Sequence, residues 1–348
     1  MGHGGDIFRN KVNIDFSVNL NPYDVTDKIL YMLEQSKDDI GHYPDNEQES
    51  LRYHLSKAEG VGFDQVFAGN GASEILLAII RAILPKKALI IKPCFSLYRD
   101  YLRTIGDCEI KEVWLKKEDG YIITKDILSY FTEDIDIVFL TDPWNPVGLN
   151  IDNDILDKIL IKTKRSGIKV ILDQSFLYMS DKAKEGFDTL EFLNRYENLL
   201  IVRSYTKCFA CPGIRMGYVL ASGENIKSIR AQLPEWNMSV ISENVMKGCA
   251  DLSCDDNFIS SSISLIDKER DYLSGELEKL KFEVFKSDTA FIMFYSKIKL
   301  YEAMLDKGIL IRDLSDMFDE SGYYRVAVKD HLSNEILIRC LGEVINGY

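Results

Sequence analysis

The stretch IDIVFLTDPWNPVGLNIDNDILDKILIKTKRSGIKVILDQ, residues 135–174, decides the fold class of this chain. Two short apolar runs, IVFL and KVILD, lie on either side of an amphipathic segment at residues 153–167. Apolar runs without polar alternation are typical of strands that are buried on both faces of a parallel sheet. A strand, a helix and a second strand in this order predict a βαβ unit.

The same alternation continues outward on both sides of this stretch. Upstream, DQVFAG precedes ASEILLAIIRAIL, and ALIIKP precedes SLYRDYLRTIG; downstream lies the apolar run NLLIVRS. The pattern extends from about residue 65 to residue 222 and predicts a doubly wound α/β domain with a mostly parallel sheet. We place this large domain at residues 41–230.

The rest of the chain has a different pattern. Residues 255–282 read as one long helix, and residues 333–347 read as a final helix. Between them, AFIMFYS, GILIRD and YYRVAV are strand-like. We therefore expect a smaller α+β domain at residues 231–348. Residues 1–40, with a helix around DKILYMLEQ, are expected to pack against this domain or against a partner.

Composition narrows the class of protein. The chain has 348 residues, a net charge of −13 and 28% charged residues, so generic nucleic-acid binding is disfavoured. The opening MGHGGDIFRN has no apolar run suited to a signal peptide, and no segment approaches ~18 uninterrupted apolar residues, as a membrane span would. Seven scattered cysteines fit a reducing cytoplasm. The four histidines show no ligand spacing, so no metal site is expected.

Four polar clusters follow predicted strands, where ligands collect in an open parallel sheet. The first is AGNGASE, residues 68–74, in which the backbone N–H groups of Gly71, Ala72 and Ser73 can bind a phosphate at a helix start. The second is LTDPWNPVG, residues 140–148, whose Asn145 can donate from its amide into the crevice. Each cluster alone can also be a tight turn.

The third and fourth clusters carry ionisable groups. Asp173 ends the run IKVILD, so it is expected to be partly desolvated and to need a facing cation or strong donor. Lys207 lies in SYTKCFACPGIRMGY, residues 204–218, eight residues before Arg215. A lysine with a lowered pKa can form a Schiff base with a carbonyl. A helix N-cap for Asp173 and a surface position for Lys207 remain the structural alternatives.

Together these groups match the needs of one cofactor, pyridoxal 5′-phosphate (PLP). It requires a backbone cradle for its phosphate, a lysine for its aldehyde, a donor for its phenolic oxygen and an acid for its ring nitrogen.

The stretch around Lys207 also resembles the signature Ser-x-Ser/Thr-Lys-(x)7-Arg of the fold-type I aminotransferases, and the resemblance covers nearly the whole chain. It implies that Lys207 and Asp173 are catalytic and that Ser204 and Arg215 contact the cofactor phosphate. The resemblance further implies cofactor contacts by Gly71, Ala72, Ser73, Thr206, Asn145 at the phenolic oxygen, Asp173 at the ring nitrogen, and Tyr98 stacked on the pyridine ring, with Phe95 as the alternative.

Within that family, the chain resembles the branch of histidinol-phosphate aminotransferase and threonine-phosphate decarboxylase. HGGD at residues 3–6, DFSVNLNP at residues 15–22 and PEWNMS at residues 234–239 favour the decarboxylase. The resemblance implies a phosphorylated amino-acid substrate, O-phospho-L-threonine, which is converted to aminopropanol phosphate for the cobalamin side chain. It implies a homodimer in which Tyr43 reaches the neighbouring subunit's cofactor phosphate. His3, Asn19, Arg312 and Arg325 are the implied substrate-binding residues.

The chain departs from the family pattern at several positions. Asp142, Trp144 and Val147 stand where relatives have Asn-x-Asn-Pro-Thr-Gly, and Gln174 stands where they have Glu. Phe176 occupies the position of a tyrosine in many aminotransferases of the branch, which fits the decarboxylase pattern or packing alone. A histidinol-phosphate type aminotransferase, a PLP-binding regulator without catalysis and a nicotinamide dehydrogenase are the alternatives. Glu74 in place of a third glycine disfavours the dehydrogenase.

Overall fold

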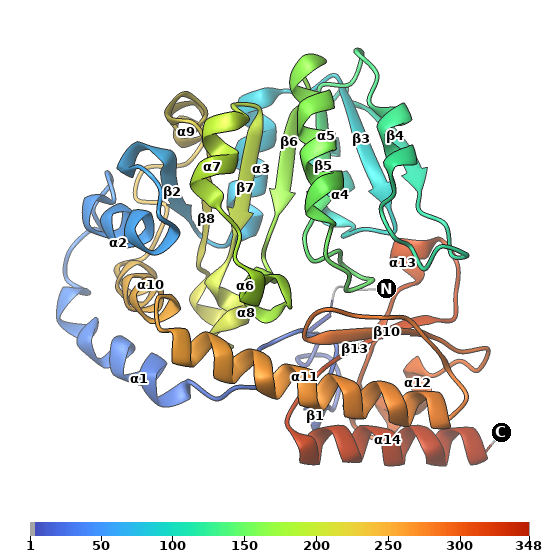
Figure 1. The fold of residues 1–348 in the computed structure, drawn as a ribbon. Helices are drawn as coiled ribbons and strands as arrows, with labels where there is room; N and C mark the ends of the chain where they lie inside the picture. Colours follow the sequence, from blue (N-terminus) through green and yellow to red (C-terminus); the bar gives the residue numbers. More distant parts are fainter. Residues whose placement is uncertain (1–3, 348) are drawn as a thin grey trace.

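A computed structural model describes residues 4–347, except for the side chain of Glu185, and its centre is a seven-stranded sheet (Figure 1). The strand order is β2-β8-β7-β6-β5-β3-β4, and β8 alone among these strands runs antiparallel to its neighbours. The expected α/β fold with a mostly parallel sheet is confirmed. The strands are β2 (Val66–Gly69), β3 (Lys87–Lys92), β4 (Glu109–Trp114), β5 (Ile137–Thr141), β6 (Lys169–Asp173), β7 (Leu199–Arg203) and β8 (Gly217–Leu220).

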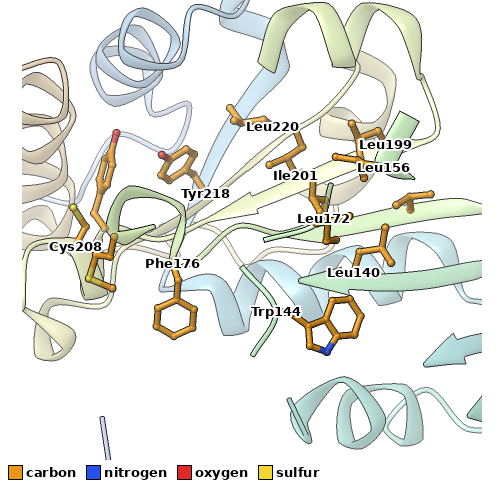
Figure 2. Packing of buried hydrophobic residues seen from close by; sticks show 14 of the residues in the cluster. Leu140, Trp144, Leu156, Leu172, Phe176, Leu199, Ile201, Cys208, Tyr218 and Leu220 are labelled. Atoms are coloured by element: carbon orange, nitrogen blue, oxygen red, sulfur yellow. The ribbon is translucent and has the colours of Figure 1, made fainter. Parts of the chain in front are cut away.

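Alternation of side chains along the central strands builds a separate apolar core on each face of this sheet. In β5, Val138 and Leu140 enter one core, whereas Ile137 and Phe139 enter the other. Figure 2 shows Leu140 and residues of the adjacent strands in the first core. Because burial of each such side chain contributes roughly 1.5–3 kcal/mol, both faces hold the strands firmly in register.

Helices cover both faces of the large sheet. The first core is covered by α2 (Glu49–Glu59), α5 (Asn153–Arg165), α7 (Thr189–Arg195) and α10 (Val240–Ser253). The second core is covered by α3 (Ala72–Ile83), α4 (Leu97–Arg103) and α9 (Gly223–Arg230). In α5 the side chain of Asp152 accepts a hydrogen bond from the Ile155 amide and so caps the helix.

A smaller domain lies below the large sheet in Figure 1. Its antiparallel sheet has the order β12-β13-β10-β9. A separate two-stranded parallel sheet pairs β1 with β11. The elements are β1 (Ile14–Asp15), β9 (Glu283–Val284), β10 (Phe291–Tyr295), β11 (Ile309–Leu310), β12 (Arg312–Asp313), β13 (Tyr323–Ala327), α11 (Asp256–Lys279), α12 (Tyr301–Asp306), α13 (Ser315–Phe318) and α14 (His331–Asn346).

Two helices near the expected domain boundaries, α1 (Thr26–Gln35) and α10, pack against each other. Strand β1 pairs with β11 of the small domain, and α1 packs on α10. Helix α10, which we assigned to the small domain, packs on α2, and its residues Val245 and Met246 belong to the core of the large sheet. Helix α10 therefore packs with the large sheet, although it lies in the range expected for the small domain.

Two further features concern the described residues alone. In residues 4–347 no helix combines the length and the apolar character that a bilayer crossing requires. The same residues contain no group of three or more His, Cys, Asp or Glu side chains arranged to hold a metal ion.

Candidate active site

A cavity of about 400 Å³ opens where the carboxyl ends of the large-sheet strands meet the small domain. Strand ends and the loops after them contribute Thr141, Asn145 and Asp173, whereas Arg312 and Arg325 come from the small domain. The cavity lies at the sheet edge where open parallel sheets bind ligands. It is lined by Gly4, Ser17, Val18, Asn19, Ala72, Ser73, Leu76, Phe95, Leu97, Thr141, Asn145, Asp173, Ser175, Phe176, Ser204, Thr206, Lys207, Arg215, Arg312, Met317 and Arg325.

Asp173, at the end of β6, is buried and held by three hydrogen bonds. Its Oδ1 accepts from the Ser175 amide at 3.0 Å and from the Ser175 hydroxyl at 2.6 Å, and its Oδ2 accepts from the Tyr98 hydroxyl at 2.8 Å. Burial raises the pKa of Asp173, and these hydrogen bonds oppose the shift. Among residues 4–347 this carboxylate has three donors but no ion-pair partner, so a cationic group in the cavity would further stabilise its anionic form.

Lys207 lies on the short helix α8 (Tyr205–Cys208), directly after β7. The Ser204 side chain caps this helix by accepting from the Thr206 amide, and its hydroxyl donates to the Met216 carbonyl at 2.8 Å. Burial, followed by the positive charges of Arg325 and Arg215, lowers the pKa of Lys207 to about 8. The amine is therefore far easier to deprotonate than an exposed lysine.

The start of α3 and Arg215 form a second wall of the cavity. Ala72 and Ser73, the first residues of α3, line the cavity with their N–H groups at the helix start, where anions are favoured. Gly71 has a positive φ of 88°, and a Cβ at this position would lie 2.5 Å from Nη2 of Arg215. Only glycine leaves room for the guanidinium beside this turn.

Two buried arginines from the small domain complete the cationic lining. The Nη1 group of Arg325 donates to Oδ1 of Asn145 at 2.5 Å, and its Nη2 group donates to the Ser17 carbonyl at 3.1 Å. Burial, followed by the charge of Arg312, lowers the pKa of Arg325 to about 9. The Nη2 group of Arg312 donates to both carboxylate oxygens of Asp316, at 2.8 Å to Oδ1 and 2.7 Å to Oδ2.

Asn19 is a buried cavity residue with unused hydrogen-bonding groups. Asn19 is 2% exposed, and neither the amide nitrogen nor the oxygen of its side chain has a hydrogen-bond partner among residues 4–347. The Nε of Arg325 is likewise without a partner within the described chain. Because buried polar groups are nearly always paired, both residues favour a polar ligand in the cavity.

The family model for aminotransferases of class I and II matches residues 11–340. The chain belongs to this family. Its family and fold are of the PLP-dependent aminotransferase type, and its relatives are decarboxylases and aminotransferases.

Individual relatives fall into both groups. The chain is 29% identical to the threonine-phosphate decarboxylase of Salmonella typhimurium, covering 96% of this chain and 92% of that one. It is 28% identical to the histidinol-phosphate aminotransferase of Thermoanaerobacter pseudethanolicus, covering 94% and 92%. The solved structure of histidinol-phosphate aminotransferase from Clostridium acetobutylicum matches with a TM-score of 0.87 at 28% identity, covering 96% of this chain and 100% of that one.

The structure separates two aromatic residues that the family resemblance left as alternatives. Tyr98 is 1% exposed and does not line the cavity; its ring stacks on Phe139 at 4.8 Å and its hydroxyl holds Asp173. Phe95 does line the cavity. Tyr98 therefore lies behind the cavity wall, and of the two rings Phe95 is the one that lines the cavity. Phe176 also lines the cavity and packs edge-on against Phe291.

The substitutions after β5 lie mostly outside the cavity. Trp144 is 2% exposed and belongs to the buried cluster shown in Figure 2. Its indole nitrogen donates to the Pro93 carbonyl at 2.7 Å, so it links the two loops and is not a lining residue of the cavity. Asp142 is fully buried and pairs with Lys182 at 2.7 Å. No motif in the sequence indicates this pair, because its members lie forty residues apart.

The remaining expected site residues lie outside the cavity or outside the described residues. Tyr43 is 78% exposed, does not line the cavity, and its ring packs against Trp236 with centroids 4.8 Å apart. Gly71 lies behind the cavity wall against Arg215. His3 lies outside the described residues. Thr141, Ser175 and Met317 line the cavity but were not expected from the sequence.

Proposed function

We propose that this enzyme binds PLP in the cavity and decarboxylates a phosphorylated amino acid, O-phospho-L-threonine, to aminopropanol phosphate. The observation that carries the proposal is Lys207, with its pKa lowered to about 8, in one cavity with the buried carboxylate of Asp173 and three arginines. The relatives named above act on threonine phosphate and histidinol phosphate, by their names.

The residues present fit PLP. Gly71 leaves room for Arg215 beside the start of α3, which gives an anion site for the phosphate. Ser73, Ser204 and Thr206 add hydroxyl groups to the same cavity. We assign Asp173 to the ring nitrogen, Asn145 to the phenolic oxygen and Phe95 to stacking on the ring, because all three line the cavity. When bound, the cofactor supplies an electron sink for the bond that breaks at the substrate α-carbon.

The protein side chains have defined tasks in this proposal. Lys207 in its neutral form attaches the cofactor and later holds or moves a proton at the substrate α-carbon. Asp173 remains an anion and keeps a proton on the ring nitrogen. Arg325 binds one anionic group of the substrate and Arg312 another, since guanidinium forks suit carboxylate and phosphate. Fixing both ends of the substrate would select which bond at its α-carbon is oriented for cleavage.

Phe176 favours decarboxylation over transamination. It presents a ring without a hydroxyl to the cavity, as expected of the decarboxylase pattern. The unpaired amide of Asn19 provides a further donor and acceptor for a substrate phosphate. A histidinol-phosphate type aminotransferase is the second candidate, because relatives of that activity are almost as similar in sequence.

The experiment is to give purified holoprotein O-phospho-L-threonine alone. Sustained release of carbon dioxide with formation of aminopropanol phosphate is expected. A single turnover that bleaches the cofactor and resumes only when a keto acid is added contradicts decarboxylation and supports the aminotransferase. Binding of PLP with no turnover of either kind supports a regulator.

We also propose a homodimer in which Tyr43 reaches the neighbouring subunit's cofactor phosphate, in a reducing cytoplasm. The exposed ring of Tyr43 beside the half-exposed Trp236 supports an interface, because exposed aromatic clusters mark contact surfaces. The odd number and scattered spacing of the seven cysteines support the compartment.

A further inference from the structure

A buried ionic cluster lies directly behind the strand ends that carry the site. The guanidinium of Arg203, at the end of β7, donates from Nε and Nη2 to Oε1 of Gln174 at 2.9 and 2.7 Å. Its Nη2 group also donates to the Thr189 hydroxyl at 3.0 Å, and its Nη1 group donates to the carboxylate of Glu59. The side chains of Arg203 and Glu59 are 3% and 1% exposed, so the pair is removed from water.

Glu59 comes from the last turn of α2 and binds three donors. Besides Arg203, its carboxylate accepts from the Tyr178 hydroxyl at 2.7 Å and from the Tyr218 hydroxyl of β8. Burial and the charge of Glu59 raise the pKa of Tyr178, which keeps this hydroxyl protonated as a donor. One carboxylate therefore ties α2, the segment after β6 and strands β7 and β8 to one another.

The cluster touches the site through the chain itself. Gln174 directly follows Asp173, and Arg203 directly precedes Ser204 and the helix that carries Lys207. The Gln174 amide donates to the Val202 carbonyl at 2.7 Å, and the side-chain bonds from Arg203 to Gln174 add a second link between the two strand ends. These two links hold the ends of β6 and β7 together, and so restrain the separation between Asp173 and Lys207, which lie beside those ends.

The charges explain why a glutamine is tolerated at this position. Relatives in the resembling family have Glu after the aspartate, whereas this chain has neutral Gln174 there and Glu59 in contact with the same arginine. The Nε2 group of Gln174 is buried and has no hydrogen-bond partner within residues 4–347, which is an energetic cost of glutamine at this position. A carboxylate at position 174 would add a second buried negative charge beside Glu59, and an unbalanced buried charge is strongly unfavourable.

We propose that Glu59 is a positioning residue of the cofactor site and supplies, from α2, the negative charge that Gln174 lacks. This inference rests on the proposed function. Removing the charge of Glu59 leaves Arg203 buried without its counter-ion and loosens the link between the ends of β6 and β7. Moving the charge to position 174 restores a neutral cluster in the same place.

The experiment compares wild type with Glu59→Gln, Gln174→Glu and the double variant Glu59→Gln/Gln174→Glu. PLP affinity is measured by absorbance titration, and thermal unfolding is measured on the cofactor-free proteins. Each single variant is expected to bind PLP roughly tenfold or more weakly, and the double variant to return to within about threefold of wild type. Glu49→Gln, the same change at an exposed position of α2, is the matched control and should bind as wild type does.

The outcomes separate the two proposals. Wild type that fails to bind PLP contradicts the proposed function. Wild type that binds PLP while Glu59→Gln binds equally well overturns the role of Glu59, as does a double variant no better than Glu59→Gln. If Glu59→Gln cannot be recovered as folded protein, the double variant is the test. A double variant that folds and binds PLP supports the relocated charge. A double variant that also cannot be recovered folded contradicts the inference.

Discussion

Lys207 is a cation in a cavity that already contains other cations. Its pKa of about 8, against an ordinary 10.5, means that below pH 8 the folded protein bears a desolvated charge that the unfolded chain keeps in water. Between pH 8 and 10.5 the folded form loses this proton while the unfolded form retains it, so this group makes stability rise with pH. Above 10.5 the lysine is neutral in both states and has no further effect.

Lys207→Met is therefore expected to stabilise the cofactor-free protein at pH 7, by about 1–3 kcal/mol. The difference from wild type should shrink between pH 8 and 10.5. Urea unfolding at pH 7 and pH 10 measures it, with Lys162→Met, at an exposed position of α5, as the control. A variant less stable than wild type by the same amount at both pH values contradicts the lowered pKa.

Phe95 gives a second prediction at the level of one side chain. Phe95→Leu should weaken PLP binding about 2- to 10-fold, because an aromatic stack contributes about 0.5–1.5 kcal/mol beyond its buried area. Phe95→Tyr keeps the ring and should bind PLP as wild type does. Fluorescence titration measures both, and an unchanged affinity in Phe95→Leu contradicts the placement of this ring.

For single residues, the sequence predicted which side chains belong to the site better than it predicted how those side chains are oriented. Lys207, Asp173 and Asn145 lie in the cavity, as their positions at strand ends indicated, and both small-domain arginines lie there as the family resemblance implied. Phe95 and Tyr98 are three residues apart near the start of a helix, and spacing alone does not show which ring faces the ligand. Glu59 had no signal at all, because its partner Arg203 is 144 residues away.

At the level of elements, the loop after β5 depends on one buried ion pair. Lys182 binds Asp142 at 2.7 Å and the Ile151 carbonyl at 2.9 Å, and Asp142 also accepts from the Ile151 amide at 2.9 Å. Burial raises the pKa of Asp142, and Lys182 opposes the shift. These bonds close the loop that carries Asn145.

Lys182→Met should therefore destabilise the fold by roughly 3–5 kcal/mol, since it leaves Asp142 buried without a counter-ion. The double variant Asp142→Asn/Lys182→Met should recover most of that loss, because neither charge is then unpaired. Urea unfolding at pH 7 gives both values. Equal stabilities for the single and double variants would contradict coupling between the two side chains.

The elements themselves were largely predictable, whereas their packing was not. The runs IVFL and KVILD became β5 and β6, and the long helical pattern became α11. Helix α10 joined the large domain against expectation, because an amphipathic helix shows in its sequence that it has a buried face but not which core buries it.

For the whole molecule, the exposed rings of Tyr43 and Trp236 predict a dimer. Light scattering on the purified protein should give twice the 39.8 kDa of one chain. Tyr43→Phe should keep the dimer but weaken PLP binding by up to about tenfold, because one hydroxyl to a phosphate is lost. A protein that is monomeric by light scattering and still binds PLP tightly contradicts a site shared between two subunits.

The charge distribution of the whole molecule combines a net negative charge with a local cluster of cations in the cavity. The chain has a net charge of −13, yet Lys207, Arg215, Arg312 and Arg325 line one cavity. The clustered cations attract anionic ligands to the junction of the two domains, whereas the net negative charge of the chain disfavours such ligands elsewhere on the surface. A phosphorylated amino acid and a phosphorylated cofactor both suit it.

Covalent attachment of PLP tests this function most directly. The protein is incubated with PLP, reduced with borohydride and digested, and its peptides are analysed by mass spectrometry. A phosphopyridoxyl group on Lys207, absent from Lys207→Ala, is the expected result. Label on other lysines alone, or the same labelling in Lys207→Ala, would contradict the role of this residue.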